Sequence, residues 1–150
     1  MPDFSGKYYY TVDPKGRVII PSPFREIIST NYSTKLFVTN DAVDNCLLIY
    51  PQEEWARLQE KVRKLPQMLE AVKYFKRRVI ASAFEVEIDK QGRVLIPAAH
   101  RQDAGISSDI VIVGQLEKIE LWDRKEWDTV NDPAKIDKAA HIAKLSELGF

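Results

Sequence analysis

The sequence predicts an α+β fold that is mainly β, built from two copies of one short β-β-α-β-β unit related by a pseudo-twofold axis. The first observation behind this prediction is a segment of the first half that recurs in the second half. The second is that each copy consists of short runs of strand-forming residues bounded by glycine and proline. The third is a stretch of helical character between the copies.

The duplication is clearest between residues 11–25 and 87–101. Identical residues return in the second copy at one constant spacing; among them, Asp13, Gly16, Arg17, Pro21 and Arg25 are matched by Asp89, Gly92, Arg93, Pro97 and Arg101. The match continues with small deletions as far as Trp55, which aligns with Trp127. A solenoid needs about three repeats to bury its faces. We therefore expect the two copies to pair with each other, with both tryptophans as core anchors.

The first copy shows the strands and the turn expected in each unit. Residues 7–12, which include three consecutive tyrosines, are rich in strand formers. Residues 13–16 form a turn, because Pro14 fixes φ at a turn position and glycine supplies a positive φ. A short strand over residues 17–20 then ends at Pro21. Residues 89–96 repeat the turn and the short strand without the first proline.

A short helix and a hairpin complete each unit. We expect the first helix to begin with Ser22 as N-cap, Pro23 at its first position and Glu26 as an acid in its first turn. The second copy begins a comparable helix at Pro97, closed by Gly105. The hairpin strands are expected at residues 35–39 with 46–50 and at residues 109–114 with 118–122.

The remaining segments are helical in character. An amphipathic stripe in the segment after Pro51 is made by Trp55, Leu58, Val62 and Leu65. Pro66 interrupts the stripe, and a second helix is expected from Gln67 to about Val79. A further helix is expected in the tail, between residues 133 and 148. The chain is thus divided into a first repeat (7–58), a helical linker (59–83), a second repeat (84–130) and a C-terminal tail (131–150).

Composition narrows the class of protein. The chain carries 22 basic and 22 acidic side chains and has no net charge, so nucleic-acid binding must rest on the local placement of charge. No run approaches the roughly 20 apolar residues of a membrane helix. Residues 1–4 lack the basic and apolar regions of a signal peptide. We therefore expect a cytoplasmic protein with no membrane partner.

No catalytic or metal-binding set is visible in the sequence. Cys46 is the only cysteine and lies in an apolar run, which indicates a small buried side chain. His100 and His141 have no cysteine or carboxylate cluster at metal-ligand spacing. No glycine-rich phosphate loop follows a strand. We expect no catalytic residues, no metal, no cofactor and no small-molecule substrate.

The two glycine-arginine turns are the candidate functional site, and two interpretations stand. In the structural one, glycine serves the backbone, the arginine decorates a strand, and Asp13 and Asp89 cap their own turns through backbone N–H groups. The aspartate-to-arginine spacing also recurs, which indicates that each arginine is held by its aspartate. In the functional interpretation, Arg17 and Arg93 bind guanine or phosphate with their planar forks while glycine lets the backbone approach closely. Paired strands joined by a tight turn enter the major groove in β-ribbon readers.

Other basic residues also have two interpretations. Arg25 and Arg101 lie in the short helices and either reach phosphate or pair with acids such as Asp13 and Asp89. The run at residues 73–78 is the most basic of the chain, and it forms either a solvated helical face or a contact with phosphate or another subunit.

Residues 13–21 and 89–97 share the pattern D-x-x-G-R-h-x-I-P, where h is an apolar residue. With this pattern the chain resembles the MraZ family of bacterial transcriptional regulators, which have two tandem SpoVT/AbrB-like units. The resemblance covers almost the whole chain, including the Leu-Ile-Tyr-Pro…Glu-Trp and Glu-Leu-Trp-Asp…Trp ends of the two repeats. It implies a swapped-hairpin β-barrel formed within one chain. It also implies a ring-like homo-oligomer that is associated with the nucleoid. This oligomer would bind short G-rich direct repeats in the promoter of the division and cell wall gene cluster and repress that cluster.

The resemblance also implies which residues face double-stranded DNA. By the family pattern these are Lys15, Gly16, Arg17, Gln91, Gly92 and Arg93. Gln91 places no charge where Lys15 does, so we expect the second turn to attract phosphate less than the first. An alternative from another class is a self-assembling barrel that binds a protein partner, as an antitoxin-like module does. A third is an enzyme in this barrel, which an unsuspected metal on the purified protein would revive.

Overall fold

The computed structural model of the protein describes residues 3–150. The first two residues of the N-terminal stretch 1–4, which has no features of a signal peptide, lie outside the described residues. The first repeat contains β1 (Lys7–Thr11), β2 (Arg17–Ile19), α1 (Ser22–Asn31), β3 (Lys35–Asn40) and β4 (Leu47–Pro51). The second contains β5 (Phe84–Glu87), β6 (Arg93–Leu95), α4 (Ala98–Asp103), β7 (Asp109–Gln115) and β8 (Lys118–Asp123). The other helices are α2 (Gln52–Arg63), α3 (Glu70–Phe75), a π-helical segment (Lys76–Ile80), α5 (Arg124–Val130), a 3-10 turn (Pro133–Lys135) and α6 (Lys138–Glu147).

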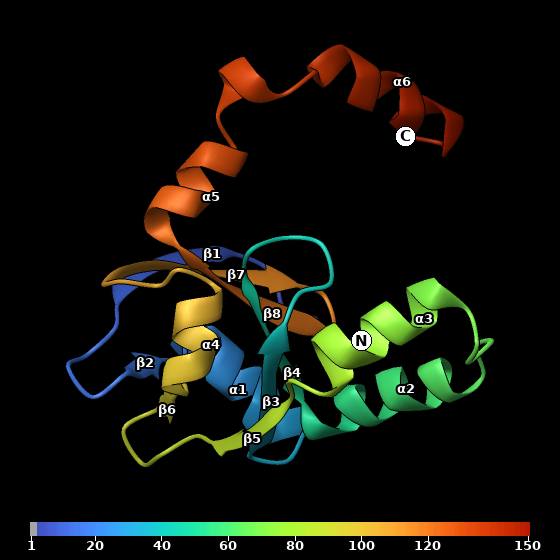
Figure 1. Ribbon diagram of the computed structural model, residues 1–150. Helices are drawn as coiled ribbons and strands as arrows, with labels where there is room; N and C mark the ends of the chain where they lie inside the picture. Colours follow the sequence, from blue (N-terminus) through green and yellow to red (C-terminus); the bar gives the residue numbers. More distant parts are fainter. Residues whose placement is uncertain (1–2) are drawn as a thin grey trace.

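The strands of the two repeats are interleaved rather than kept apart. A six-stranded sheet has the order β1-β7-β8-β4-β3-β5, and β2 and β6 form a separate two-stranded sheet (Figure 1). In the large sheet, β1 of the first repeat pairs with β7 of the second, and β5 of the second pairs with β3 of the first. All of these pairs are antiparallel. Val18 pairs with Val94 at the centre of the small sheet, where the pseudo-twofold axis is expected.

The α+β class is confirmed, but the strand pairing of residues 3–150 does not close a barrel. The large sheet has two edges, β1 and β5, and the two-stranded sheet shares no strand with it. The short strands β2 and β6 each have three residues and pair only with each other. They therefore cover the large sheet as a second layer instead of joining its edges.

The main core lies between the large sheet and the layer formed by β2, β6, α1 and α4 (Figure 1). Val18 and Val94 each point inward from their strands and are 1% exposed. A second cluster lies on the other face of the sheet, where Trp55 of α2 and Val79 pack. Because both faces of the sheet are covered, every residue of β4 is buried. In a strand with one solvent-exposed face, buried and exposed residues would alternate. Burial of each large apolar side chain contributes about 1.5–3 kcal/mol.

The start of α1 differs from the sequence prediction. Ser22 is the first helical residue rather than the cap; the N-cap is Pro21, no side chain bonds there, and the first turn contains no acid. Pro97 precedes α4 in the same way. The proline ring holds φ at −51° and −57° in the two cases, an extended conformation that suits a cap without a side-chain hydrogen bond. Gly105 follows α4 with a φ of +63°, as its expected role at the helix end requires.

The linker and tail are helical, as predicted. The segment expected as one helix from Gln67 to about Val79 is α3 continued by the π-helical segment. In α2, Trp55 and Val62 are buried, but Leu65 lies beyond the helix end and is 41% exposed. Trp127, expected as a core anchor like Trp55, is only half-buried and packs edge-on against Trp122.

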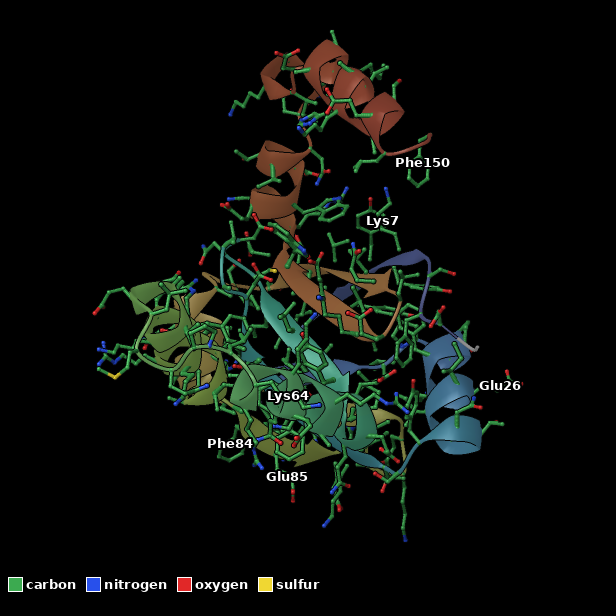
Figure 2. The ribbon with its side chains drawn as sticks, turned by 90° about the vertical axis from the view of Figure 1, so that its right-hand side faces the viewer. Lys7, Glu26, Lys64, Phe84, Glu85 and Phe150 are labelled. Carbon is green, nitrogen blue, oxygen red and sulfur yellow. The ribbon has the colours of Figure 1, made fainter. Side chains whose placement is uncertain are left out.

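The helix α6 has no buried residue and projects away from the sheets, and the chain ends beyond it at Phe150 (Figures 1 and 2). Among the helices of residues 3–150, none has the length and apolar character needed to cross a membrane.

Candidate nucleic-acid interface

The two glycine-arginine turns lie on one side of the molecule. The first joins β1 to β2, the second joins β5 to β6, and both project from the side opposite α2 and α3 (Figure 1). Their common position follows from the antiparallel pairing of β2 with β6, in which Arg17 lies opposite Leu95 and Arg93 opposite Ile19. The duplication of the sequence therefore places two equivalent turns on the same side of the molecule.

Each aspartate closes its own turn with three hydrogen bonds. Asp13 Oδ1 accepts from the backbone N–H of Lys15 at 2.9 Å and of Arg17 at 2.8 Å, and its Oδ2 accepts from Arg17 Nε at 2.6 Å. In the second turn, Asp89 accepts from the backbone N–H of Gln91 and of Arg93, both at 2.9 Å, and from Arg93 Nε at 3.0 Å. The aspartate thus caps the backbone and holds the arginine at the same time.

These bonds fix the charge of the turns. The backbone N–H of Arg17 is the main cause that holds the pKa of Asp13 below its ordinary value, and the N–H of Arg93 acts in the same way on the pKa of Asp89. Both carboxylates are therefore ionised at neutral pH. The arginine side chains are 29% and 26% exposed, and each engages its aspartate through Nε, so the Nη groups are not used in that ion pair.

The two turns differ in the donors that they leave free. An Nη of Arg93 donates to the side-chain oxygen of Gln91 at 3.3 Å. No such bond from Arg17 occurs within residues 3–150, since Lys15 stands at the matching position and has no acceptor. Each turn thus carries one lysine beside its arginine, Lys15 in the first and Lys90 in the second. Within residues 3–150, the first turn leaves one more guanidinium donor free than the second.

Glycine is required at the fourth position of each turn. Gly16 and Gly92 have φ values of +86° and +80°, in the left-handed region that other residues rarely adopt. The N–H of Gly16 donates to the carbonyl of Asp13, and that of Gly92 to the carbonyl of Asp89, each at 3.0 Å. Both turns are therefore closed by the same backbone bond.

Arg25 and Arg101 do not form the ion pairs considered for them. Within residues 3–150 neither guanidinium has a carboxylate at ion-pair distance, and Asp13 and Asp89 pair with the arginines of their own turns. Arg101 instead lies against Gly16, and Arg25 lies against Gly92. Both therefore join the site, each at the turn of the other repeat, and this placement depends on the interleaving of the repeats.

The basic run at residues 73–78 lies elsewhere. It belongs to α3 and the π-helical segment, on the side away from the turns (Figure 1). Lys73 pairs with Glu70 at 3.5 Å, and Arg78 Nε donates to the carbonyl of Asp41 at 2.6 Å. Part of this charge is thus used in contacts within the linker and with the first repeat, and the run is not continuous with the two turns.

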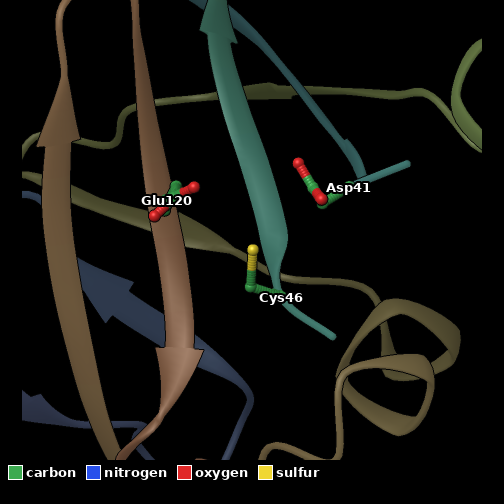
Figure 3. Close-up of side chains that lie close together, drawn as sticks. All are labelled: Asp41, Cys46 and Glu120. Atoms are coloured by element: carbon green, nitrogen blue, oxygen red, sulfur yellow. The ribbon is translucent and has the colours of Figure 1, made fainter. Parts of the chain in front are cut away.

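One group of possible metal ligands could not be found from sequence spacing. Asp41, Cys46 and Glu120 bring their ligand atoms within 4.8 Å of one another, with the thiol between the two carboxylates (Figure 3). The expected burial of Cys46 is confirmed at 2% exposed, and burial raises the pKa of its thiol. Burial likewise raises the pKa of Glu120. Both carboxylates already accept hydrogen bonds from their neighbours, Asp41 from Val43 and Glu120 from Trp122.

Comparison with known proteins assigns the chain to a class. The sequence profile described as "MraZ protein, putative antitoxin-like" matches twice, at residues 4–78 and 79–146. A protein from Clostridium tetani is 44% identical over 147 residues, which cover 98% of this chain and 99% of that protein. A protein from Acetivibrio thermocellus is 40% identical over 147 residues (98% of this chain, 99% of that protein), and one from Lachnoclostridium phytofermentans is 41% identical over 147 residues (98% of both).

All three relatives are named "Transcriptional regulator MraZ". The two-repeat fold, its duplicated arginine turns and these relatives define a transcriptional regulator. The chain belongs to the MraZ family.

Proposed function

We propose that this protein is a sequence-specific DNA-binding repressor of the division and cell wall gene cluster. In this proposal, the two glycine-arginine turns bind short direct repeats in its own promoter. The observation that carries the proposal is the matched hydrogen bonding of Arg17 and Arg93, which fixes two partly exposed guanidinium groups at turns that lie on one side of the molecule (Figure 1). An arginine held in this way is preorganised for a guanine edge or a phosphate, and a good bidentate contact to guanine contributes about 1–3 kcal/mol of discrimination.

The remaining residues of the turns have defined roles in this proposal. Lys15 adds phosphate attraction at the first turn, while Gln91 makes the second turn the weaker of the two. Gly16 and Gly92 let the backbone approach the DNA closely. The helix arginines, Arg25 and Arg101, lie beside the turns and complete the DNA-binding site behind them.

The proposed active form is a ring-like homo-oligomer. A chain with 22 basic and 22 acidic side chains has no bulk attraction for DNA. A ring that places the turns of several copies along one rim concentrates positive charge there, with the acidic residues elsewhere. The exchange of β1 and β5 between the repeats supports a swapped-hairpin architecture for each subunit. We propose that the protein acts without enzymatic chemistry or cofactor, in the cytoplasm and on the nucleoid.

The experiment that tests this function is a binding titration on the DNA upstream of the protein's own gene. The R17A/R93A double variant is expected to bind at least tenfold more weakly than the unchanged protein, because it loses both guanidinium contacts. The matched control is R63A/K64A, which removes two exposed basic side chains at the end of α2, on the side of the molecule away from the turns (Figure 1). Unchanged affinity of a folded, assembled R17A/R93A variant would overturn the proposal.

A second candidate function is binding of a protein partner. The edge strand β5, which carries Phe84 (Figure 2), favours it. Phe84 and Leu95 are each 54% exposed and border an apolar hollow of about 280 Å³. An exposed strand edge is a template for pairing with another chain. If this candidate is right, F84S abolishes partner binding and R17A/R93A leaves it intact.

A further inference from the structure

Each turn is held by the backbone of the opposite repeat. The N–H of Ile20, which follows β2, donates to the carbonyl of Gly92 at 2.9 Å. The N–H of Ile96, which follows β6, donates to the carbonyl of Gly16 at 3.0 Å. The glycine of each turn is therefore attached across the pseudo-twofold axis.

The side chains of the helix arginines, Arg101 and Arg25, likewise contact the turn of the opposite repeat. A Cβ built on Gly16 would lie 2.8 Å from Cζ of Arg101, which is closer than real Cβ atoms approach a neighbour. A Cβ on Gly92 would overlap Arg25 even more closely. The absence of a side chain on each glycine thus makes room for the arginine of the other repeat, in addition to allowing the positive φ of the turn.

The hydrogen bonds of these arginines indicate a supporting role. Arg101 Nε donates at 3.1 Å to the carbonyl of Ile96, the residue whose N–H binds Gly16. Arg101 therefore packs on the first turn and also holds the strand end attached to that turn. Arg25 Nε is buried without a hydrogen-bond partner among the described residues, so at Gly92 the guanidinium acts by packing.

We propose that Arg101 is a positioning residue for Arg17 and that Arg25 is a positioning residue for Arg93. Each acts on the opposite repeat, through the glycine that precedes the DNA-contacting arginine. This inference rests on the proposed function and deepens it, because the two turns become mutually dependent. A shift of Gly16 moves the adjacent Arg17, and a displaced guanidinium loses its bidentate geometry on a base edge.

The first test measures backbone hydrogen exchange without DNA, by mass spectrometry of the assembled protein. R101A is expected to speed exchange of the amides of residues 13 and 15–17 at least threefold more than that of residues 89–93, and R25A is expected to do the reverse. Equal acceleration of both turns, or acceleration of the turn in the same repeat, overturns the proposal. If R25A does not fold, R25M replaces it, because methionine keeps an apolar stem without the planar guanidinium group.

The second test is a double-mutant cycle on promoter DNA. R101A is expected to weaken binding about tenfold, and R17A is then expected to cost much less in the R101A background than alone, because the two changes disable the same contact. R93A is expected to cost the same in both backgrounds. R101K distinguishes positioning from direct phosphate contact, because lysine keeps the charge but lacks the planar group. The proposal expects R101K to bind DNA as weakly as R101A. Affinity restored by R101K would show that only the charge is needed and would contradict the proposal.

The two tests separate failure of this inference from failure of the proposed function. If exchange follows the crosswise pattern but R17A does not weaken DNA binding, the support of the turns stands and the assignment of DNA to them falls. If R17A weakens DNA binding but R101A couples to R93A instead, the function stands and crosswise positioning is wrong.

Discussion

The central residue-level feature of this protein is an ionised aspartate that closes a turn and orients an arginine. Asp13 and Asp89 make equivalent sets of bonds, and in both the carboxylate is stabilised mainly by a backbone N–H. An acceptor that is fully charged at neutral pH holds an N–H or a guanidinium more firmly than a neutral one does. The orientation of Arg17 and Arg93 therefore depends on the charge of one neighbour each.

The turns are expected to loosen in acid. The pKa of Asp13 and of Asp89 in the folded protein lies below the ordinary value of 3.8, so their contribution is fully present above that value. It is lost as the pH falls below 3.8 and through the lowered pKa, because the carboxyls become protonated. Protection factors of the amides of residues 13, 15–17 and 89–93, corrected for the intrinsic pH dependence of exchange, measure this change. The D13N/D89N variant serves as control, with low protection at neutral pH and no further acid-dependent loss; loosening of the unchanged protein already above pH 5 contradicts the account.

Cys46 is expected to be chemically inert in the folded protein. Its side chain is 2% exposed, and burial raises the pKa of the thiol, so very little thiolate is present at neutral pH. Reaction with a thiol reagent should be at least about a hundredfold slower than in denaturant, since it waits for opening of the structure. Comparable rates in the two conditions would show that the thiol is accessible.

The local part of the site was predictable from the sequence, and the long-range part was not. The turn geometry of Asp13, Gly16 and Arg17 depends on partners within a few residues, so spacing and residue type were enough to predict it. The position of Arg101 against Gly16 depends on how the repeats interleave, which no local pattern encodes. The approach of Glu120 to Cys46 has the same origin, because it follows from the pairing of β4 with β8.

At the level of elements, local signals predicted the strands, the hairpins and the linker helices. Alternating apolar residues and turn-forming residues are sufficient for this. The start of α1 was misplaced because Pro21 takes the cap position that Ser22 was expected to fill. The open sheet was not predicted, since strand order is set by packing between repeats rather than by any one strand.

The helix α1 anchors the first repeat to the main core through Phe24. Its ring is fully buried and packs edge-on against Phe4 and Tyr8, with ring centroids 5.4 and 5.3 Å apart. F24A is expected to destabilise the protein by about 3–5 kcal/mol, because it removes apolar contacts and leaves a cavity. Denaturant unfolding measures the change; R63A, at an exposed linker position, should stay within about 0.5 kcal/mol of the unchanged protein. A comparable loss in both variants contradicts the core assignment.

The tail is expected to contribute little to the stability of the fold. The helix α6 buries none of its residues and extends away from the sheets, so its removal exposes no core surface. A chain ending at Asp132 should unfold within about 0.5 kcal/mol of the full chain. Thermal or denaturant unfolding of the two chains provides the measurement, and a large destabilisation would show that the tail packs on the fold.

For the whole molecule, interleaving makes the two repeats one cooperative unit. Neither β1 nor β5 pairs with a strand of its own repeat, and the two-stranded sheet takes one strand from each. The same topology brings both arginine turns to one side of a chain that has no net charge. The function proposed here therefore depends on the placement of a few basic groups, not on bulk attraction.

The salt dependence of DNA binding tests this account most directly. Binding to the upstream DNA is measured over a range of salt concentrations for the unchanged protein, R17A/R93A and R63A/K64A. Each lost phosphate contact lowers the steepness of log K against log salt by about one, so R17A/R93A should give a shallower slope and weaker binding. The R63A/K64A control should reproduce the slope of the unchanged protein. Equal slopes and affinities for R17A/R93A and the unchanged protein would contradict the assignment of DNA contact to the two turns.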